Sequence, residues 1–167
     1  FLAILLQTMY EELFTQLQAE TEQPGTALQK LKHTMLRLAR LLREHGGWLG
    51  RVWADAARCD QVAQDFLKKN GSRHMQLIIL LILQAKQEQE LGDIAPMQAF
   101  TFLMGSIAAP MVIAPRVMQL GFAPQFFHEQ MQESVLSDDA IVERVERALF
   151  ALTIPKTSLS CGDQHHA

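Results

Sequence analysis

Residues 72–90 read SRHMQLIILLILQAKQEQE and contain the longest apolar run of the chain, Leu77 to Leu83. In a helix, Leu, Ile and Met at these positions would occupy every side, because successive side chains turn by about 100°. A helix that is apolar all round is buried by other helices. The stretch therefore predicts a central helix in the middle of the core.

Helical periodicity extends from this stretch toward the N-terminus. Leu2, Leu5, Leu6, Met9, Leu13 and Leu17 predict a first helix that runs to about Glu22. Thr26 is the expected N-cap of a second helix, which Gly46 and Gly47 should end. A short helix over 48–57 and a further helix capped by Asp60 follow, and the Asn70-Gly71 pair breaks or bends the latter.

The C-terminal half has the same character. Pro96 suits the first turn of a helix that is kinked or broken near Pro110 and Pro115. Pro124 opens another helix, and Ser137 or Asp138 caps a last one. Because no strand pattern competes, we predict an all-α, multi-helix bundle.

Composition narrows the class of protein. The chain has 167 residues, enough for one domain, and 49% of them are hydrophobic while 20% are charged. A formal charge of −3 argues against this chain holding nucleic acid by itself. Cys59 and Cys161 form no metal or disulfide framework, so a reducing cytoplasm is expected. The run 77–83 is far shorter than the roughly 20 residues of a membrane helix, and no membrane role is predicted.

Neither a catalytic nor a metal site is predicted. None of the familiar nucleophile, zinc, phosphate or dinucleotide motifs occurs. Adjacent carboxylates such as Asp138 and Asp139 point in different directions on a helix, and His165 and His166 cannot complete a metal site alone. The chain is therefore expected to be no enzyme and to carry no cofactor.

The last helix has a regular apolar stripe of Ile141, Val145, Leu149 and Leu152. Two interpretations are open, because the stripe can pack inside one chain or meet a second chain. A terminal helix has few neighbours in its own chain, and an exposed stripe of this size is a sticky patch. A dimer interface is therefore the favoured interpretation.

The order of these helices, from the opening FLAILLQTMYEELF through a long apolar helix to a final apolar pair, resembles the C-terminal domain of the tetracycline-repressor (TetR) family. The resemblance implies a ligand-sensing and dimerisation domain over residues 1–154, whose last two helices form a four-helix dimer interface. Residues 155–167 would be a disordered tail. A helix-turn-helix unit that binds operator DNA would precede residue 1, making the chain a fragment.

The function expected from this resemblance is that of a ligand-responsive transcriptional regulator, a repressor that works as a homodimer and binds a small hydrophobic or aromatic effector. The candidate pocket walls are Trp48, Trp53, Met75, Phe100, Phe102, Met104 and Met111, and the candidate polar groups are Tyr10, His33, Arg37, Arg73 and His74. For each of these positions, core packing or solvation is the competing interpretation. The alternative function is a helical scaffold without DNA binding, which would have a filled core in place of a cavity.

Overall fold

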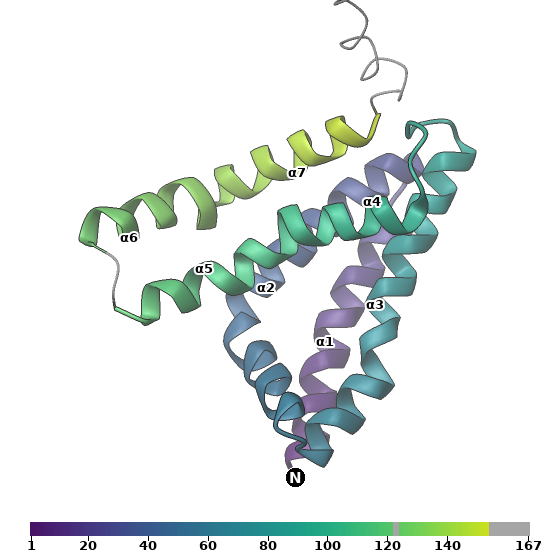
Figure 1. Ribbon diagram of the computed structural model, residues 1–167. Helices are drawn as coiled ribbons and strands as arrows, with labels where there is room; N and C mark the ends of the chain where they lie inside the picture. The colour runs from purple at the N-terminus through teal and green to yellow at the C-terminus, as the bar shows by residue number, and fades with distance from the viewer. Residues whose placement is uncertain (122–123, 154–167) are drawn as a thin grey trace, which may run out of the picture.

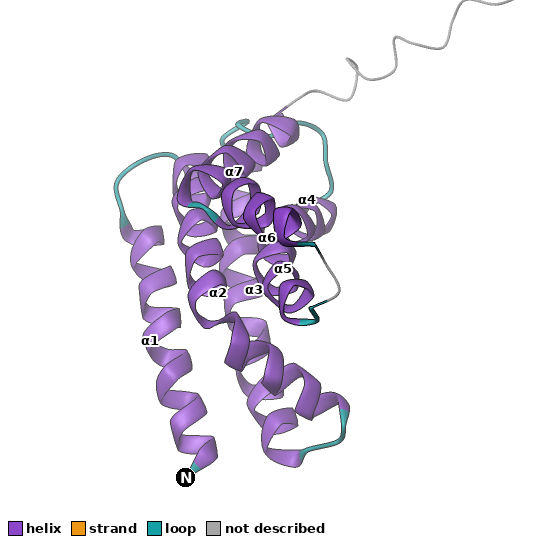
Figure 2. Ribbon diagram, turned by 90° about the vertical axis from the view of Figure 1, so that its left-hand side faces the viewer, coloured by secondary structure: helices purple, strands orange, loops and turns teal. Residues whose placement is uncertain are grey.

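The computed structural model describes residues 1–121 and 124–153, and every regular element within them is helical (Figure 2). The all-α prediction is confirmed, while the expected tail, 155–167, lies outside the described residues. The elements are α1 Leu2–Glu22, α2 Ala27–Ala57, α3 Gln61–Gln87, α4 Pro96–Leu103, the π-helical turn η1 Met104–Ala108, α5 Ala109–Gln119, α6 Gln125–Met131, the π-helical turn η2 Gln132–Leu136 and α7 Asp138–Thr153.

Two groups of helices meet along α2. Helices α1 and α3 pack against each other and against α2, while α4, η1 and α5 together with η2 and α7 cover the other end of the molecule (Figure 1). The N-terminus lies at the end of α1 that is remote from α7 (Figure 1). The main core, with the fully buried Leu31, Met35, Ile82 and Met111, lies where α2, α3, α5 and α7 converge.

Three helix starts confirm the predicted caps. Thr26 and Gln29 form a capping box, with the Gln29 amide N–H donating to the Thr26 hydroxyl. Asp60 accepts from the backbone N–H of Ala63 at 2.8 Å, and Ser137 accepts from that of Ala140 at 3.2 Å. Such caps satisfy N–H groups that the first turn leaves free and contribute about 0.5–2 kcal/mol each.

The second helix does not end at Gly46 and Gly47, as expected, but continues to Ala57. Gly46 and Gly50 lie one turn apart, and both are buried beside α5. A Cβ at Gly46 would lie 3.6 Å from the Met111 carbonyl oxygen, and one at Gly50 would overlap the Arg116 guanidinium. Gly50 therefore leaves room for the Arg116 side chain of α5, while a Cβ at Gly46 would make an ordinary contact with the α5 backbone.

The expectation that residues 72–90 form the central helix is wrong. Helix α3 buries Ile78, Leu81 and Ile82, but Leu80 is 64% exposed and Leu83 is 40% exposed on its other side. The helix with neighbours on most sides is α2, which packs on α1, α3, α5 and α7. The central position of α2 could not be read from the sequence pattern, because this helix carries several charged residues. Arg37, Arg40 and Arg43 extend past the core and pair with acidic side chains on other elements.

The helix after Pro96 changes register before Pro110. The Ala109 N–H donates to the Met104 carbonyl, which is the five-residue spacing of a π-helix. Pro110 has no N–H and cannot bond the Ser106 carbonyl four residues before it, so the local widening at η1 accommodates the ring. The predicted disturbance near Pro110 is therefore a π-helical turn.

Within the described residues, Pro96–Gln119 is the helical segment that is long and apolar enough to cross a membrane by length and composition, and 39% of its most apolar window is buried. This segment contains no long uninterrupted apolar run, because Thr, Gly, Ser and Pro divide it. Leu103, Ile107 and Met111 of this segment are buried in the main core.

The apolar stripe of α7 packs inside its own chain, which corrects the favoured assignment to a dimer interface. Ile141, Val145, Leu149 and Leu152 are each at most 5% exposed and belong to the main core. Helix α7 has more neighbours than its terminal position suggests, because it lies against α2, α4, η1 and η2. Of the two interpretations, packing within one chain is the one found.

Replacing Leu149 with Ala should lower the free energy of unfolding by about 2–5 kcal/mol, because a buried side chain is lost and a cavity remains. Phe150→Ala, one residue away but 69% exposed, should change it by less than about 0.5 kcal/mol. Urea unfolding at several low protein concentrations measures both. If the decrease in the free energy of unfolding caused by Leu149→Ala disappears at low protein concentration, Leu149 lies in a subunit interface.

Candidate functional site

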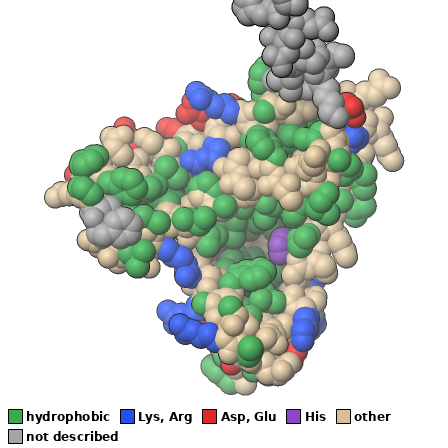
Figure 3. All heavy atoms as spheres, in the orientation of Figure 1, with side chains coloured by type: hydrophobic (Ala, Val, Ile, Leu, Met, Phe, Trp, Pro, Cys, Tyr) green, Lys and Arg blue, Asp and Glu red, His purple; other side chains and the backbone are tan. Residues whose placement is uncertain are grey.

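An apolar cavity of about 460 Å³ lies between α1, α2, α3 and the η1–α5 segment. Figure 3 shows a hollow in this part of the surface, with hydrophobic side chains around it and a histidine at its edge. Cavities that hold small molecules commonly have volumes of roughly 300–1,000 Å³ and mostly apolar walls. The size and chemistry of this one fall within that class.

Each helix contributes one face to the cavity. The α1 wall consists of Tyr10, Leu13, Phe14 and Leu17, which share a face through their three- and four-residue spacing; the α3 wall consists of Phe66, Leu67, Asn70, Gly71 and His74; and α2 supplies Leu38, Leu41, Leu42, Leu49, Gly50 and Trp53. The last wall is Met104, Ala108, Ala109 and Val112. Because Gly50, Gly71, Ala108 and Ala109 have little or no side chain, these walls leave space between them.

Asn70 is the most buried polar group at the cavity, with 1% of its surface exposed. Its amide nitrogen donates to the Phe66 carbonyl at 3.1 Å and to Gln7 Oε1 at 3.0 Å. In return, Gln7 Nε2 donates to Asn70 Oδ1 at 3.2 Å. These bonds satisfy a buried amide that would otherwise cost about 1–3 kcal/mol, and they fasten α1 to α3.

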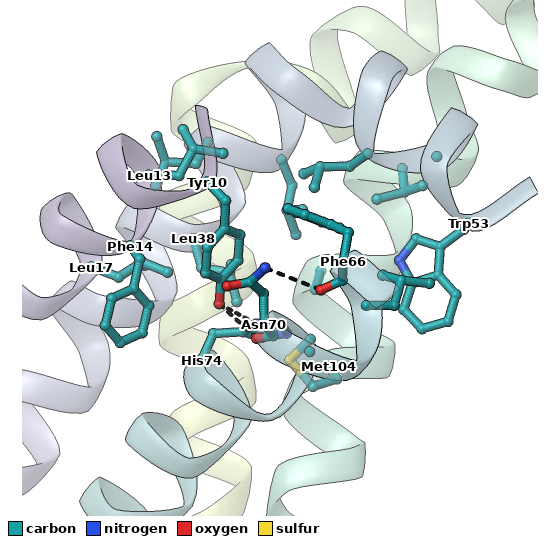
Figure 4. A pocket seen from close by; sticks show the side chains of 18 of the residues that line it. Tyr10, Leu13, Phe14, Leu17, Leu38, Trp53, Phe66, Asn70, His74 and Met104 are labelled. Atoms are coloured by element: carbon teal, nitrogen blue, oxygen red, sulfur yellow. Dashed lines mark hydrogen bonds between the residues drawn. The ribbon is translucent and has the colours of Figure 1, made fainter. Parts of the chain in front are cut away.

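Tyr10 and His74 stand beside this bridge (Figure 4). The Tyr10 hydroxyl donates to the Asn70 carbonyl at 2.8 Å and lies 3.4 Å from His74 Nδ1. Burial raises the pKa of Tyr10 above its ordinary value and lowers the pKa of His74, because a low-dielectric surrounding disfavours the charged form of each group. Both side chains are therefore neutral near pH 7.

A charged cluster closes the outer side of α1. Arg73 forms two hydrogen bonds with the Glu11 carboxylate, at 2.6 and 3.0 Å, and its guanidinium lies 4.1 Å from the centre of the Phe14 ring. The hydrogen bond from Arg73 holds the pKa of Glu11 below its ordinary value. Arg73 thus serves to position α1 and Phe14, and its charge is already matched.

The structure brings some of the predicted pocket residues together and separates others. Tyr10, Trp53, His74 and Met104 line the cavity. Phe100 and Met111 are buried in the main core, His33 is exposed, and Arg37 pairs with Glu20 at 3.0 Å. Met75 and Phe102 are 37% and 41% exposed and do not line the cavity.

Trp48 has an intermediate position. It packs against the main core and against a smaller cluster formed by Leu6, Tyr10, Val52, Ala63 and Phe66. Its ring meets the Phe66 ring edge-on at 6.4 Å, but it does not line the cavity. Its indole N–H is buried and has no hydrogen-bond partner among the described residues. Trp48 therefore supports the wall from behind.

Sequence reasoning missed the residues that shape the site most. The Asn70-Gly71 pair was expected to break or bend the helix, but α3 continues through it and the Asn70 side chain joins α3 to α1. The sequence does contain a pattern that indicates this wall of the cavity. Phe66, Asn70 and His74 are spaced by four residues and so share one face of a helix. Within the described residues, no group of three or more His, Cys, Asp or Glu side chains is placed to hold a metal ion.

Comparison of the chain with protein-family models, curated proteins and solved structures gave no significant match.

Lowering the pH from about 7.5 to about 5 should reduce the free energy of unfolding partly through His74. The pKa of His74 is lower in the folded chain than the roughly 6.5 of an unfolded chain. As the pH decreases, the unfolded chain therefore takes up a proton at His74 before the folded chain does, and the free energy of unfolding decreases. Glu11, beside it, has a lowered pKa and keeps its charge here, as does Arg73.

Urea unfolding across this range should show a shallower pH dependence for His74→Gln than for the wild-type chain. The matched control is His33→Gln, the same substitution at an exposed position on α2. Identical slopes for wild type and His74→Gln would mean that His74 is protonated equally in the folded and unfolded chains.

Proposed function

We propose that this chain is the ligand-sensing and dimerising part of a ligand-responsive transcriptional regulator, a repressor of the TetR type that acts in the cytoplasm. The observation that supports it is the apolar cavity between α1 and the rest of the bundle. Helical proteins that serve only as scaffolds fill their cores, since a void forfeits packing energy. A cavity of this volume with polar groups at one place is the form of a small-molecule site.

The position of α1 relates this cavity to regulation. Tyr10, Leu13, Phe14 and Leu17 of α1 form one wall, and the same helix extends to the N-terminal end of the chain. In the proposed regulator this helix connects the sensing bundle to a DNA-binding unit. A ligand that binds more tightly to one placement of α1 than to another shifts the population between them, and only that difference in affinity can alter DNA binding.

Homodimerisation is the second part of the proposal. With the α7 stripe inside the chain, the candidate surface is the outer side of α4, η1 and α5, where Met97 is 54%, Phe102 41% and Ile113 56% exposed. Figure 3 shows hydrophobic side chains gathered over this region. Beside this surface lies a shallow groove, which is lined by Phe102, Ser106, Ser134, Ala140, Glu143, Arg144, Arg147 and Ala148.

The cavity assignment predicts that Nile red, a neutral dye whose emission brightens in apolar surroundings, binds the wild-type chain saturably at one site. Gly71→Phe should weaken this binding at least about tenfold, because Gly71 lines the cavity and a side chain there meets no atom within 4 Å of its Cβ. Fluorescence titration measures the affinity.

The matched control is Gly47→Phe, which places the same side chain in open space on α2 away from this cavity. Dye bound equally by wild type and both variants would lie on the exposed apolar surface, and the proposed ligand site would then be wrong. Thermal unfolding of each variant establishes that it is folded.

The dimer assignment predicts that the wild-type chain has the mass of a dimer by light scattering at micromolar concentration. Phe102→Glu combined with Ile113→Glu should give a monomer, because two charges would be buried without partners. Leu80→Glu, a change at a 64% exposed position on α3, is the control that should remain dimeric. A double variant that stays dimeric would place the interface elsewhere.

A further inference from the structure

The side chains that line the cavity carry no ionised group. All of them are apolar except Tyr10, Trp53, Asn70 and His74, and burial keeps Tyr10 and His74 uncharged near pH 7. Arg73, on the same helix as the lining residues Asn70 and His74, is paired with Glu11. An ionised ligand would lose its hydration here without gaining a counter-charge, which is strongly unfavourable.

Hydrogen bonds within the protein already occupy most of the polar atoms at the cavity. The Asn70 amide nitrogen donates to Phe66 and Gln7, while its side-chain oxygen accepts from Gln7 at 3.2 Å and from Arg73 at 3.4 Å. The Tyr10 hydroxyl can only be the donor to the Asn70 carbonyl, because a carbonyl oxygen has no proton to give. Neither residue therefore has a free proton for a ligand.

This arrangement favours one position for the proton of His74. Since the Tyr10 proton points to Asn70, only lone pairs of the Tyr10 oxygen face His74 Nδ1 across 3.4 Å. This contact favours the tautomer in which Nδ1 carries the imidazole proton and donates to Tyr10. In that tautomer Nε2 is a hydrogen-bond acceptor, and the described residues form no hydrogen bond with it.

We propose that the cavity selects an uncharged, mainly aromatic or alicyclic molecule bearing a hydroxyl group, and that His74 Nε2 accepts the hydrogen bond from this hydroxyl. Figure 4 shows His74 with Tyr10 and Asn70, while Trp53 lies well away from them in this view. The hydroxyl therefore binds at the His74 end, and the apolar body of the ligand extends among Leu, Phe and Trp side chains. This inference rests on the proposed ligand-sensing function and specifies the chemistry of its site.

The test is displacement of bound Nile red by three probes that differ only in their polar group. At neutral pH 4-phenylphenol donates a hydrogen bond, 4-methoxybiphenyl cannot donate, and biphenyl-4-carboxylate is charged. We expect 4-phenylphenol to displace the dye at about tenfold lower concentration than either of the others, the ratio that one hydrogen bond provides.

Two substitutions of His74 assign the preference to Nε2. His74→Leu removes the acceptor and should reduce the ratio between phenol and ether to within about twofold. His74→Gln retains a side-chain oxygen acceptor at similar reach and should keep a clear preference for the phenol. Nile red affinity and thermal unfolding of both variants show that the cavity is intact.

Each outcome addresses one step. Equal displacement by phenol and ether, or displacement by neither, overturns the selection for a hydroxyl group. The ligand-sensing function is still supported in that case if Gly71→Phe blocks binding of the dye. Equal displacement by phenol and carboxylate overturns the requirement for an uncharged ligand. An undiminished phenol preference in His74→Leu overturns the role of His74, and loss of the Gly71→Phe effect removes the site itself.

Discussion

The continuity of α2 is the constraint on which the rest of the structure depends. Because this helix runs unbroken from Ala27 to Ala57, it packs on α1 and α3 along one part of its length and on α5 and α7 along another. Gly50 leaves room beside the helix for the Arg116 side chain of α5. A break at this point would separate the two groups of helices and remove the common wall between them. The intrinsic cost of Gly within a helix, about 1 kcal/mol each, is offset by the packing of α2 against its neighbours.

The cavity follows from the same arrangement. Large side chains such as Tyr10, Phe14 and Phe66 space the helices, while Gly71, Ala108 and Ala109 in the same walls leave the space between them unfilled. Polar groups keep α1 in place where apolar packing is incomplete. The amide pair of Gln7 and Asn70, the Tyr10 hydroxyl and the Arg73–Glu11 pair all join α1 to α3. Helix α1 is thus held by a few directional contacts beside a cavity.

These contacts give the cavity its chemical character. The described side chains of the wall carry no ionised group, which disfavours charged ligands, and in the proposed site His74 Nε2 accepts a hydrogen bond from the ligand. Binding beside Tyr10 and Asn70 places a ligand next to the bonds that fasten α1. A molecule that rearranges those bonds would change the preferred position of α1, which is how a sensing bundle can transmit occupancy to a unit attached to that helix.

The helical class, the Thr26, Asp60 and Ser137 caps and four of the cavity residues follow from the amino-acid pattern alone, because periodicity and capping depend on neighbours a few positions away. Only the tertiary structure decided that Gly46 lies inside a helix, that α2 and not α3 is central, and that Val145 and Leu149 pack within the chain. The same holds for Asn70, whose partners Gln7 and Tyr10 are at least 60 positions away. Glycine and asparagine have a low intrinsic preference for the interior of a helix. Packing against another helix or a hydrogen bond to a residue distant in the sequence can offset that preference. Such contacts form only when the chain folds, so they cannot be read from neighbouring residues.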